Sequence, residues 1–109
     1  MDITMNFVAA GQKPLEGGYV TARETDQQLV VRAQRGDTRA FDLLVLKYQG
    51  RIATLVARFV NDAAEVEDVT QEAFIKAFRA LPKFRGESAF YTWLYRIASN
   101  AAKNYLVAR

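Results

Sequence analysis

The sequence predicts an all-α protein, a compact bundle of about four helices that follows an irregular N-terminal tail. Three observations lead to this fold class. Several segments repeat apolar residues at the spacing of an amphipathic helix, no segment alternates apolar and polar residues as a half-buried strand does, and the connections between the periodic segments are short. A chain of 109 residues, half of them apolar or aromatic, can build one domain around a single core.

The first 24 residues contain three glycines and a proline and show no sustained periodicity, so we expect an irregular or disordered extension over residues 1–24. The domain then covers residues 25–109. Its first helix begins with Thr25 or Asp26 as the N-cap and ends before Gly36. This helix is short and depends on tertiary packing.

The second predicted helix has Asp37 as its N-cap and runs to about Val60. Leu43 and Leu46 lie on the far side of this helix, where they are either ordinary exposed apolar residues or a contact with another protein. The remaining apolar residues share one arc that packs against other helices. They are Phe41, Leu44, Val45, Tyr48, Ile52, Leu55, Val56 and Phe59.

The third predicted helix covers approximately Ala63 to Leu81, where Pro82 stops it. Away from its apolar side it presents a small apolar residue among carboxylates and an amide. This is either an ordinary solvated face or the anchor of a protein contact. The residues are Asp68, Gln71, Glu72 and Ile75.

The fourth predicted helix is capped by Ser88 and continues to the end of the chain. One face is apolar and includes Leu94 and Ile97. The opposite face combines an aromatic ring, cations and amides, groups that bind nucleic acid but that also occur on solvated helix faces. Its members are Trp93, Arg96, Asn100, Lys103 and Asn104.

The loop before this helix places Phe84 between Lys83 and Arg85. An aromatic flanked by cations at a helix N-terminus can hold a phosphate and stack on an unpaired base. Phe84 can equally be a residue that fills the core. Gly86 permits the turn that this loop requires.

Charge is unevenly distributed along the chain, which suggests two different partners. The segment from Asp62 to Glu72 contains acids and no base, whereas the segment from Ala73 to Arg109 contains one acid, Glu87, among many bases. The bases that precede the fourth helix are Lys76, Arg79, Lys83 and Arg85.

The chemistry of most enzymes is missing from this sequence. The chain has no His, no Cys and no Gly-rich phosphate loop, so we expect no catalytic residues. Asp68 and Glu72 stand one helical turn apart, but this spacing is ordinary on helix surfaces, and we expect neither a metal nor another cofactor. No stretch is long and apolar enough for a signal peptide or a membrane span, so we expect a cytoplasmic protein without membrane insertion.

The run DVTQEAFIKAFRALPKFRGESAFYTWLYRIASNAAKNYL resembles region two of the bacterial extracytoplasmic-function sigma factors, in particular their sigma-E-like, envelope-stress branch. The resemblance extends back through RAQRGDTRAFDLLVLKYQGRIATLV and covers about residues 25–109. It is specific, because the order DxxQExF followed by FRGxSxFxTWLYRIAxN is long.

The resemblance implies a role for each surface. The acidic helix docks on the β′ clamp helices of core RNA polymerase through Asp68, Gln71, Glu72 and Ile75. The loop and the fourth helix recognise the minus-ten promoter element, with a base of the non-template single strand flipped into a loop pocket that Phe84 flanks and that Asn100 and Ile97 complete. The groups around the DNA backbone and adjacent duplex are Lys76, Arg79, Arg85, Arg96, Lys103 and Asn104.

Trp93 matches the first of two tryptophans that wedge the duplex edge in primary sigma factors, but Leu94 follows it here. The resemblance also implies an anti-sigma factor as a partner. Sigma factors of this family carry a second helical domain for the minus-thirty-five element, which is absent from this chain, so we expect a truncated form.

The preferred hypothesis is therefore a non-enzymatic domain that directs transcription initiation at stress-response genes. Two alternatives stay open. One is a helical regulator that binds duplex DNA through the fourth helix, and the other is a helical adaptor that binds only proteins. Binding to single-stranded promoter DNA separates the first hypothesis from both alternatives.

Overall fold

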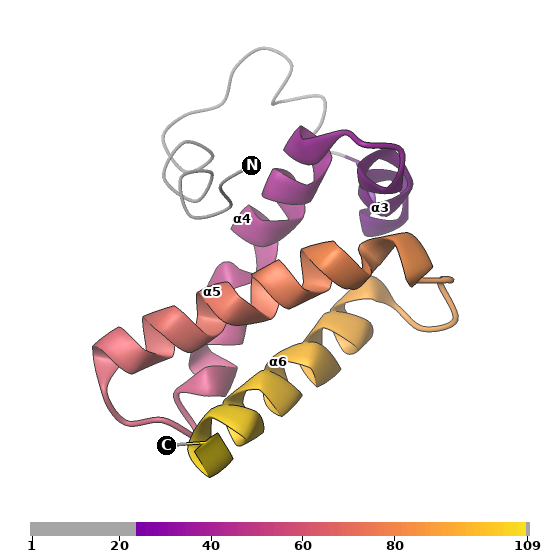
Figure 1. Cartoon of the computed structure of the whole chain (residues 1–109). Coiled ribbons are helices and arrows are strands. Elements are labelled where there is room, and N and C mark those ends of the chain that lie inside the picture. Colours follow the sequence, from indigo (N-terminus) through magenta and orange to yellow (C-terminus); the bar gives the residue numbers. More distant parts are fainter. Residues whose placement is uncertain (1–23, 109) are drawn as a thin grey trace.

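A computed structural model of the protein describes residues 24–108, which form an all-α bundle without strands in this range (Figure 1). The predicted fold class is confirmed. The predicted tail over residues 1–24 lies almost wholly outside the described residues. The elements are α3 (Asp26–Gln34), α4 (Thr38–Val56), α5 (Ala63–Ala80), the 3-10 turn η1 (Leu81–Lys83) and α6 (Phe90–Ala108).

Helix α3 begins with a capping box at Thr25. The Thr25 hydroxyl accepts a hydrogen bond from the backbone N–H of Gln28 at 3.2 Å, and the Gln28 side chain accepts one from the Thr25 N–H at 2.9 Å. Asp26 is free for another role and accepts from Lys47 at 2.7 Å and from the Tyr48 hydroxyl. Burial and the bond to Asp26 raise the pKa of Tyr48, so its hydroxyl remains a donor that ties α3 to α4.

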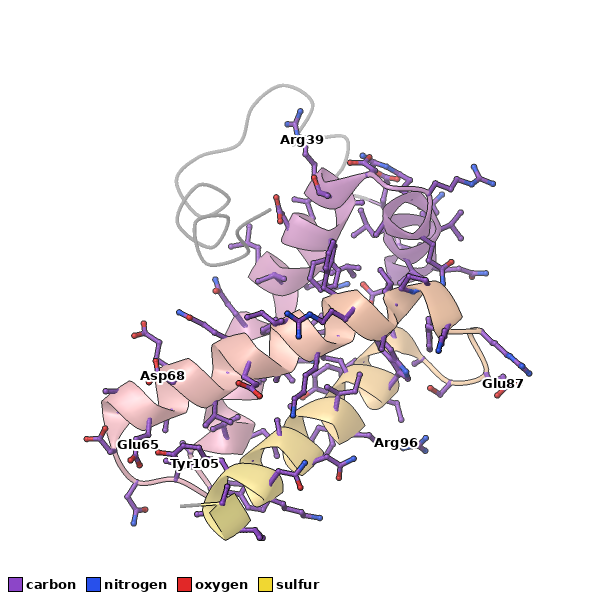
Figure 2. All side chains as sticks on the ribbon, in the orientation of Figure 1. Arg39, Glu65, Asp68, Glu87, Arg96 and Tyr105 are labelled. Atoms are coloured by element: carbon purple, nitrogen blue, oxygen red, sulfur yellow. The ribbon has the colours of Figure 1, made fainter. Side chains whose placement is uncertain are left out.

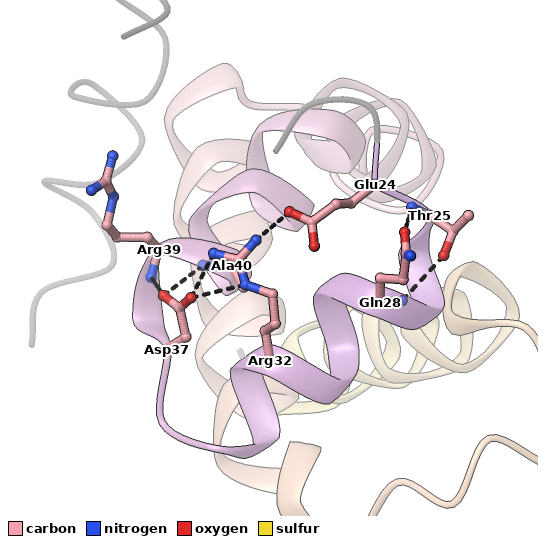
Figure 3. Close-up of polar contacts among 7 residues, drawn as sticks. All are labelled: Glu24, Thr25, Gln28, Arg32, Asp37, Arg39 and Ala40. Atoms are coloured by element: carbon pink, nitrogen blue, oxygen red, sulfur yellow. Dashed lines mark hydrogen bonds and ion pairs between the residues drawn. The ribbon is translucent and has the colours of Figure 1, made fainter. Parts of the chain in front are cut away.

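The corner between α3 and α4 is held by Arg32 and Asp37 (Figure 3). The guanidinium of Arg32 donates to Asp37 at 3.0 and 2.6 Å and also to Glu24. Asp37 caps α4 as predicted, because its side chain accepts from the N–H groups of Arg39 at 3.1 Å and Ala40 at 3.4 Å. The Arg32 hydrogen bond holds the pKa of Asp37 below its usual value.

Helix α4 is the centre of the bundle, and α3, α5 and α6 all pack against it. It ends at Val56 and not at about Val60 as predicted. Tight backbone bonds, such as the one from the Phe59 N–H to the Val56 carbonyl at 2.9 Å, turn the chain, and Val60 becomes buried in the core. This turn lets the chain reverse and pack α5 against α4. The apolar periodicity of the sequence does not show where such a turn must come.

Helices α5 and α6 run side by side and contact each other along their lengths (Figure 1). The predicted turn at Gly86 is confirmed, because this residue has φ +77°. The predicted N-cap at Ser88 is wrong. Helix α6 begins at Phe90, the Ala89 carbonyl accepts its first helical bond from Trp93, and the Ser88 hydroxyl donates to that same carbonyl.

None of the helices within residues 24–108 has the length and apolar character needed to cross a bilayer.

Candidate nucleic-acid and polymerase interfaces

Phe84 joins the loop after η1 to the first turns of α6 through an aromatic cluster. Its ring centroid lies 4.8 Å from that of Trp93 and 6.2 Å from that of Phe90. Phe90 is buried, whereas Phe84 and Trp93 are half-buried. The ring therefore packs on the edge of the core and stays partly exposed, and its contact with nucleic acid remains a prediction.

Gln34 of α3 fastens this loop from the other side. Its side-chain amide donates to the carbonyls of Leu81 at 3.0 Å and Phe84 at 2.8 Å. The position of Phe84 is thus fixed both by ring packing and by a hydrogen-bonded contact with another helix. Sequence reasoning missed Gln34, because no local pattern reports a contact that spans about fifty residues.

A groove of about 840 Å³ lies between α3 and the loop. Phe84, Arg85 and Gly86 line one side of it, and Lys47 contributes a second cation. Ile97 and Asn100 lie one and two helical turns beyond Trp93, the residue on which the Phe84 ring packs. A base pocket shared by Phe84, Ile97 and Asn100 stays a prediction.

The predicted nucleic-acid groups of α5, the loop and α6 are predominantly exposed. Lys76 and Arg79 lie on α5, Lys83 and Arg85 lie before α6, and Arg96, Asn100, Lys103 and Asn104 lie on α6, where Arg96 projects outward (Figure 2). Lys76 pairs with Glu72 at 3.5 Å, and Arg85 with Glu87 at 3.9 Å. Such exposed pairs are weak, so these cations can exchange their partner for a phosphate.

Two predicted base contacts on α6 are more enclosed than the cations. Ile97 is half-buried and packs against the core, as does Trp93. Leu94 is 0% exposed. Because the residue after Trp93 is fully buried, a wedge of two adjacent side chains cannot form on this surface.

The acidic surface of α5 lies on another side of the helix pair from Arg96 (Figure 2). Asp68 and Glu72 are exposed, whereas Gln71 and Ile75 are half-buried. Ile75 packs against the core, so it is an extension of the core onto the surface and not an isolated apolar residue. Within residues 24–108, no three acidic, His or Cys side chains gather in a way that could hold a metal ion.

Leu43 and Leu46 are half-buried, which corrects the expectation that both are exposed. Leu43 packs against the core. The physical reason is that α4 has helices on several sides, so it lacks the open far side that a surface helix has. Their contact with another protein stays a prediction.

The family model for sigma-70 region 2 matches residues 44–109. The chain is 74% identical over 87 residues to the RNA polymerase sigma-H factor of Pseudomonas aeruginosa, a match that covers 80% of this chain and 45% of that protein. It is 66% identical over 85 residues to the ECF RNA polymerase sigma-E factor of Escherichia coli K12, covering 78% and 44%. The chain thus spans about half the length of the curated relatives it matches.

Two solved structures share the fold. An engineered region 2 of sigmaE, determined in complex with GTAAAA, is 59% identical with a TM-score of 0.75, and the match covers 79% of this chain and 90% of that one. CnrH, determined in complex with the cytosolic domain of CnrY, is 32% identical with a TM-score of 0.69, covering 74% and 53%. Sequence motifs, fold and relatives agree, and the chain belongs to the sigma-70 region 2 family of RNA polymerase sigma factors.

Proposed function

We propose that residues 25–109 form the part of a sigma factor that binds core RNA polymerase and recognises the minus-ten promoter element. The observation that carries this proposal is the likeness to the engineered region 2 of sigmaE that was solved with GTAAAA. In this proposal the domain directs transcription initiation at stress-response genes in the cytoplasm. The domain itself catalyses no reaction, because bond formation belongs to the polymerase.

Promoter DNA contacts the loop and α6 in this proposal. A base of the non-template strand leaves the stack and is held beside Phe84, where Arg85 can meet its phosphates. Ile97 and Asn100, one and two turns beyond the Trp93 ring that packs on Phe84, stand against the same base. Arg96, Lys103 and Asn104 lie beside the DNA backbone.

Core polymerase contacts α5 through its acidic surface. Asp68 and Glu72 offer exposed carboxylates to the β′ clamp helices, and Ile75, less than one turn beyond Glu72, offers a half-buried apolar contact. An anti-sigma factor is a further proposed partner. The similarity to CnrH, which was solved with the cytosolic domain of CnrY, supports this part of the proposal.

The experiment that tests this function compares DNA forms. Fluorescence anisotropy would measure binding of the chain to a single strand containing GTAAAA, to the same sequence as duplex, and to a strand with those bases scrambled. Because a stacking and basic surface suits an unpaired base better than a groove of duplex DNA, the unscrambled single strand should bind most tightly. Duplex binding that equals or exceeds single-strand binding would contradict the proposal and favour a duplex-binding regulator.

A further inference from the structure

A second groove, of about 410 Å³, lies between α4 and α6. None of the residues assigned above to promoter DNA or to polymerase lines it. Helix α4 contributes Arg51, the turn after α4 contributes Arg58, and α6 contributes two tyrosines. The lining residues are Gly50, Arg51, Thr54, Leu55, Arg58, Tyr91 and Tyr95.

The groove is cationic. Arg51 and Arg58 are exposed, no carboxylate lines the groove, and neither arginine forms an ion pair within residues 24–108. Lys47, which like Arg51 lies on α4, is by contrast paired with Asp26 of α3. The two guanidinium groups, Arg51 within α4 and Arg58 in the turn that follows it, both line the groove. They can follow an extended anionic backbone.

The arginines are combined with ring surfaces. The Arg51 guanidinium lies 5.3 Å from the ring centroid of Tyr91, which itself stacks on Tyr48 at 4.9 Å. Tyr95 meets Tyr91 edge-on at 6.0 Å and is 38% exposed. The Tyr91 ring therefore fixes the position of the Arg51 guanidinium. Part of the Tyr95 ring is exposed, and a base can stack on it.

Gly50 supports a ligand in this groove. It lies inside α4, where glycine is less favourable than alanine, and it does not have the positive φ that would require glycine. A Cβ atom at this position would meet nothing within 4 Å. The backbone of α4 is therefore open to the groove at Gly50, and a ligand can approach it closely.

We infer that the groove formed by Arg51, Arg58, Tyr91 and Tyr95 is a second binding surface for single-stranded DNA. Unpaired arginines, an exposed ring and an open backbone match the phosphates and bases of a strand. An acidic polypeptide is the competing ligand. It is less favoured because protein contacts are usually centred on an apolar pocket, and Leu55, the one aliphatic residue of the lining, is buried.

The two grooves adjoin along α4, because Lys47 lines the loop groove and Arg51, one helical turn further on, lines the second groove. That one strand follows both grooves rests on the proposed function. Tyr91 and Trp93 are two residues apart, so their side chains leave α6 in nearly opposite directions. Trp93 contacts Phe84, and Tyr91 lines the second groove. A strand held by the loop can therefore pass the first turn of α6 and continue along α4.

The test uses the whole chain and three single strands: GTAAAA alone, and GTAAAA with about ten added nucleotides on its 5′ or its 3′ side. One of the longer strands should bind about tenfold more tightly than GTAAAA, with a salt dependence steeper by about 0.7 for each added phosphate contact. Arg51→Ala with Arg58→Ala should abolish this gain and leave GTAAAA binding unchanged. Gly50→Leu should also abolish it, because it fills the groove without changing charge.

The matched control is Arg35→Ala with Arg39→Ala, which removes the same charge from exposed arginines near the other end of α4. If the control variant loses as much affinity for the longer strand as the Arg51 and Arg58 variant does, the gain in affinity comes from general charge attraction and the inference is wrong. It is also wrong if neither extension tightens binding. A polyglutamate peptide that shifts the amide resonances of Gly50 and Thr54, when neither long strand does, would assign the groove to an acidic polypeptide.

Failure of the proposed function has a different signature. In that case GTAAAA alone would not bind. The second groove would still be judged by whether a longer strand shifts the Gly50 and Thr54 resonances in the unchanged protein and leaves them in place in the Arg51 and Arg58 variant.

Discussion

Phe84 is the residue at which the core meets the proposed DNA surface. Phe84→Ala should weaken binding to strands with any base at the captured position, because stacking is worth about 1–3 kcal/mol per base and tolerates every base. The change also removes contacts to Phe90 and Trp93, so unfolding should become easier by about 1–3 kcal/mol. Anisotropy titrations below the melting temperature separate these two effects. A variant that stays folded and binds GTAAAA normally would remove Phe84 from the DNA surface.

Asn100 makes a different prediction, since it offers an exposed side-chain amide on α6. Asn100→Ala should reduce discrimination at one nucleotide by about 1–3 kcal/mol, because an amide pairs with a base edge. Strands carrying each of the four bases at successive positions would measure this. Lys103→Ala is the control, and it should weaken every strand alike and make the salt dependence shallower. A uniform loss with Asn100→Ala would show a backbone contact instead.

Asp37 gives a prediction about pH. Its folded-state pKa is lowered by the hydrogen bond from Arg32, so its ionised form contributes stability above the ordinary aspartate pKa and loses it as pH falls through the lowered value. Asp37→Asn keeps a capping side chain but loses this attraction. Urea unfolding should show a loss of about 0.5 kcal/mol at pH 7, the size of a partly exposed ion pair. The same difference at pH 2.5 would contradict this account.

At the scale of a helix, α5 has exposed acids on one side while its other side packs on α4 and α6. Glu72→Lys should weaken binding to isolated β′ clamp helices by about tenfold or more, because it places a cation where the proposed contact needs an anion. The Glu72 side chain is 61% exposed, so the unfolding free energy should change by about 0.5 kcal/mol or less. Retention of the chain on a column of clamp helices measures the binding.

Glu67→Lys is the matched control for this helix, because Glu67 is exposed and lies at the edge of the acidic surface. It should retain most of the binding. Ile75→Glu is a poorer test, since Ile75 packs against the core and a buried charge there should destabilise the fold by about 1–3 kcal/mol. Unchanged retention of the Glu72 variant would show that this surface is not the polymerase contact.

At the scale of the whole molecule, α4 makes the bundle one cooperative unit. Leu44 is 0% exposed at the centre of the core, so Leu44→Ala should cost about 2–5 kcal/mol and lower the melting temperature by roughly 10–25 °C. Helical circular dichroism and Trp93 fluorescence should report the same midpoint, because α3, α5 and α6 share this core. Two separate midpoints would show that the Trp93 region unfolds on its own.

The sequence by itself determined the fold class, the starts of most helices and the family. These features depend on neighbours along the chain. The capping side chains of Thr25 and Asp37 act within one helical turn, and apolar periodicity marks the buried side of each helix. The motif from Asp68 to Asn100 identified the family because its residue order is long and specific.

Only the tertiary structure decided which side chains meet. The end of α4 at Val56 follows from the path back into α5, and the burial of Leu43 follows from the number of helices around α4. The hydrogen bonds of Gln34 to the loop, and the arrangement of Arg51 over Tyr91, join residues far apart in sequence. Such contacts depend on how the helices pack in three dimensions, so they cannot be predicted from local helix propensity or residue spacing.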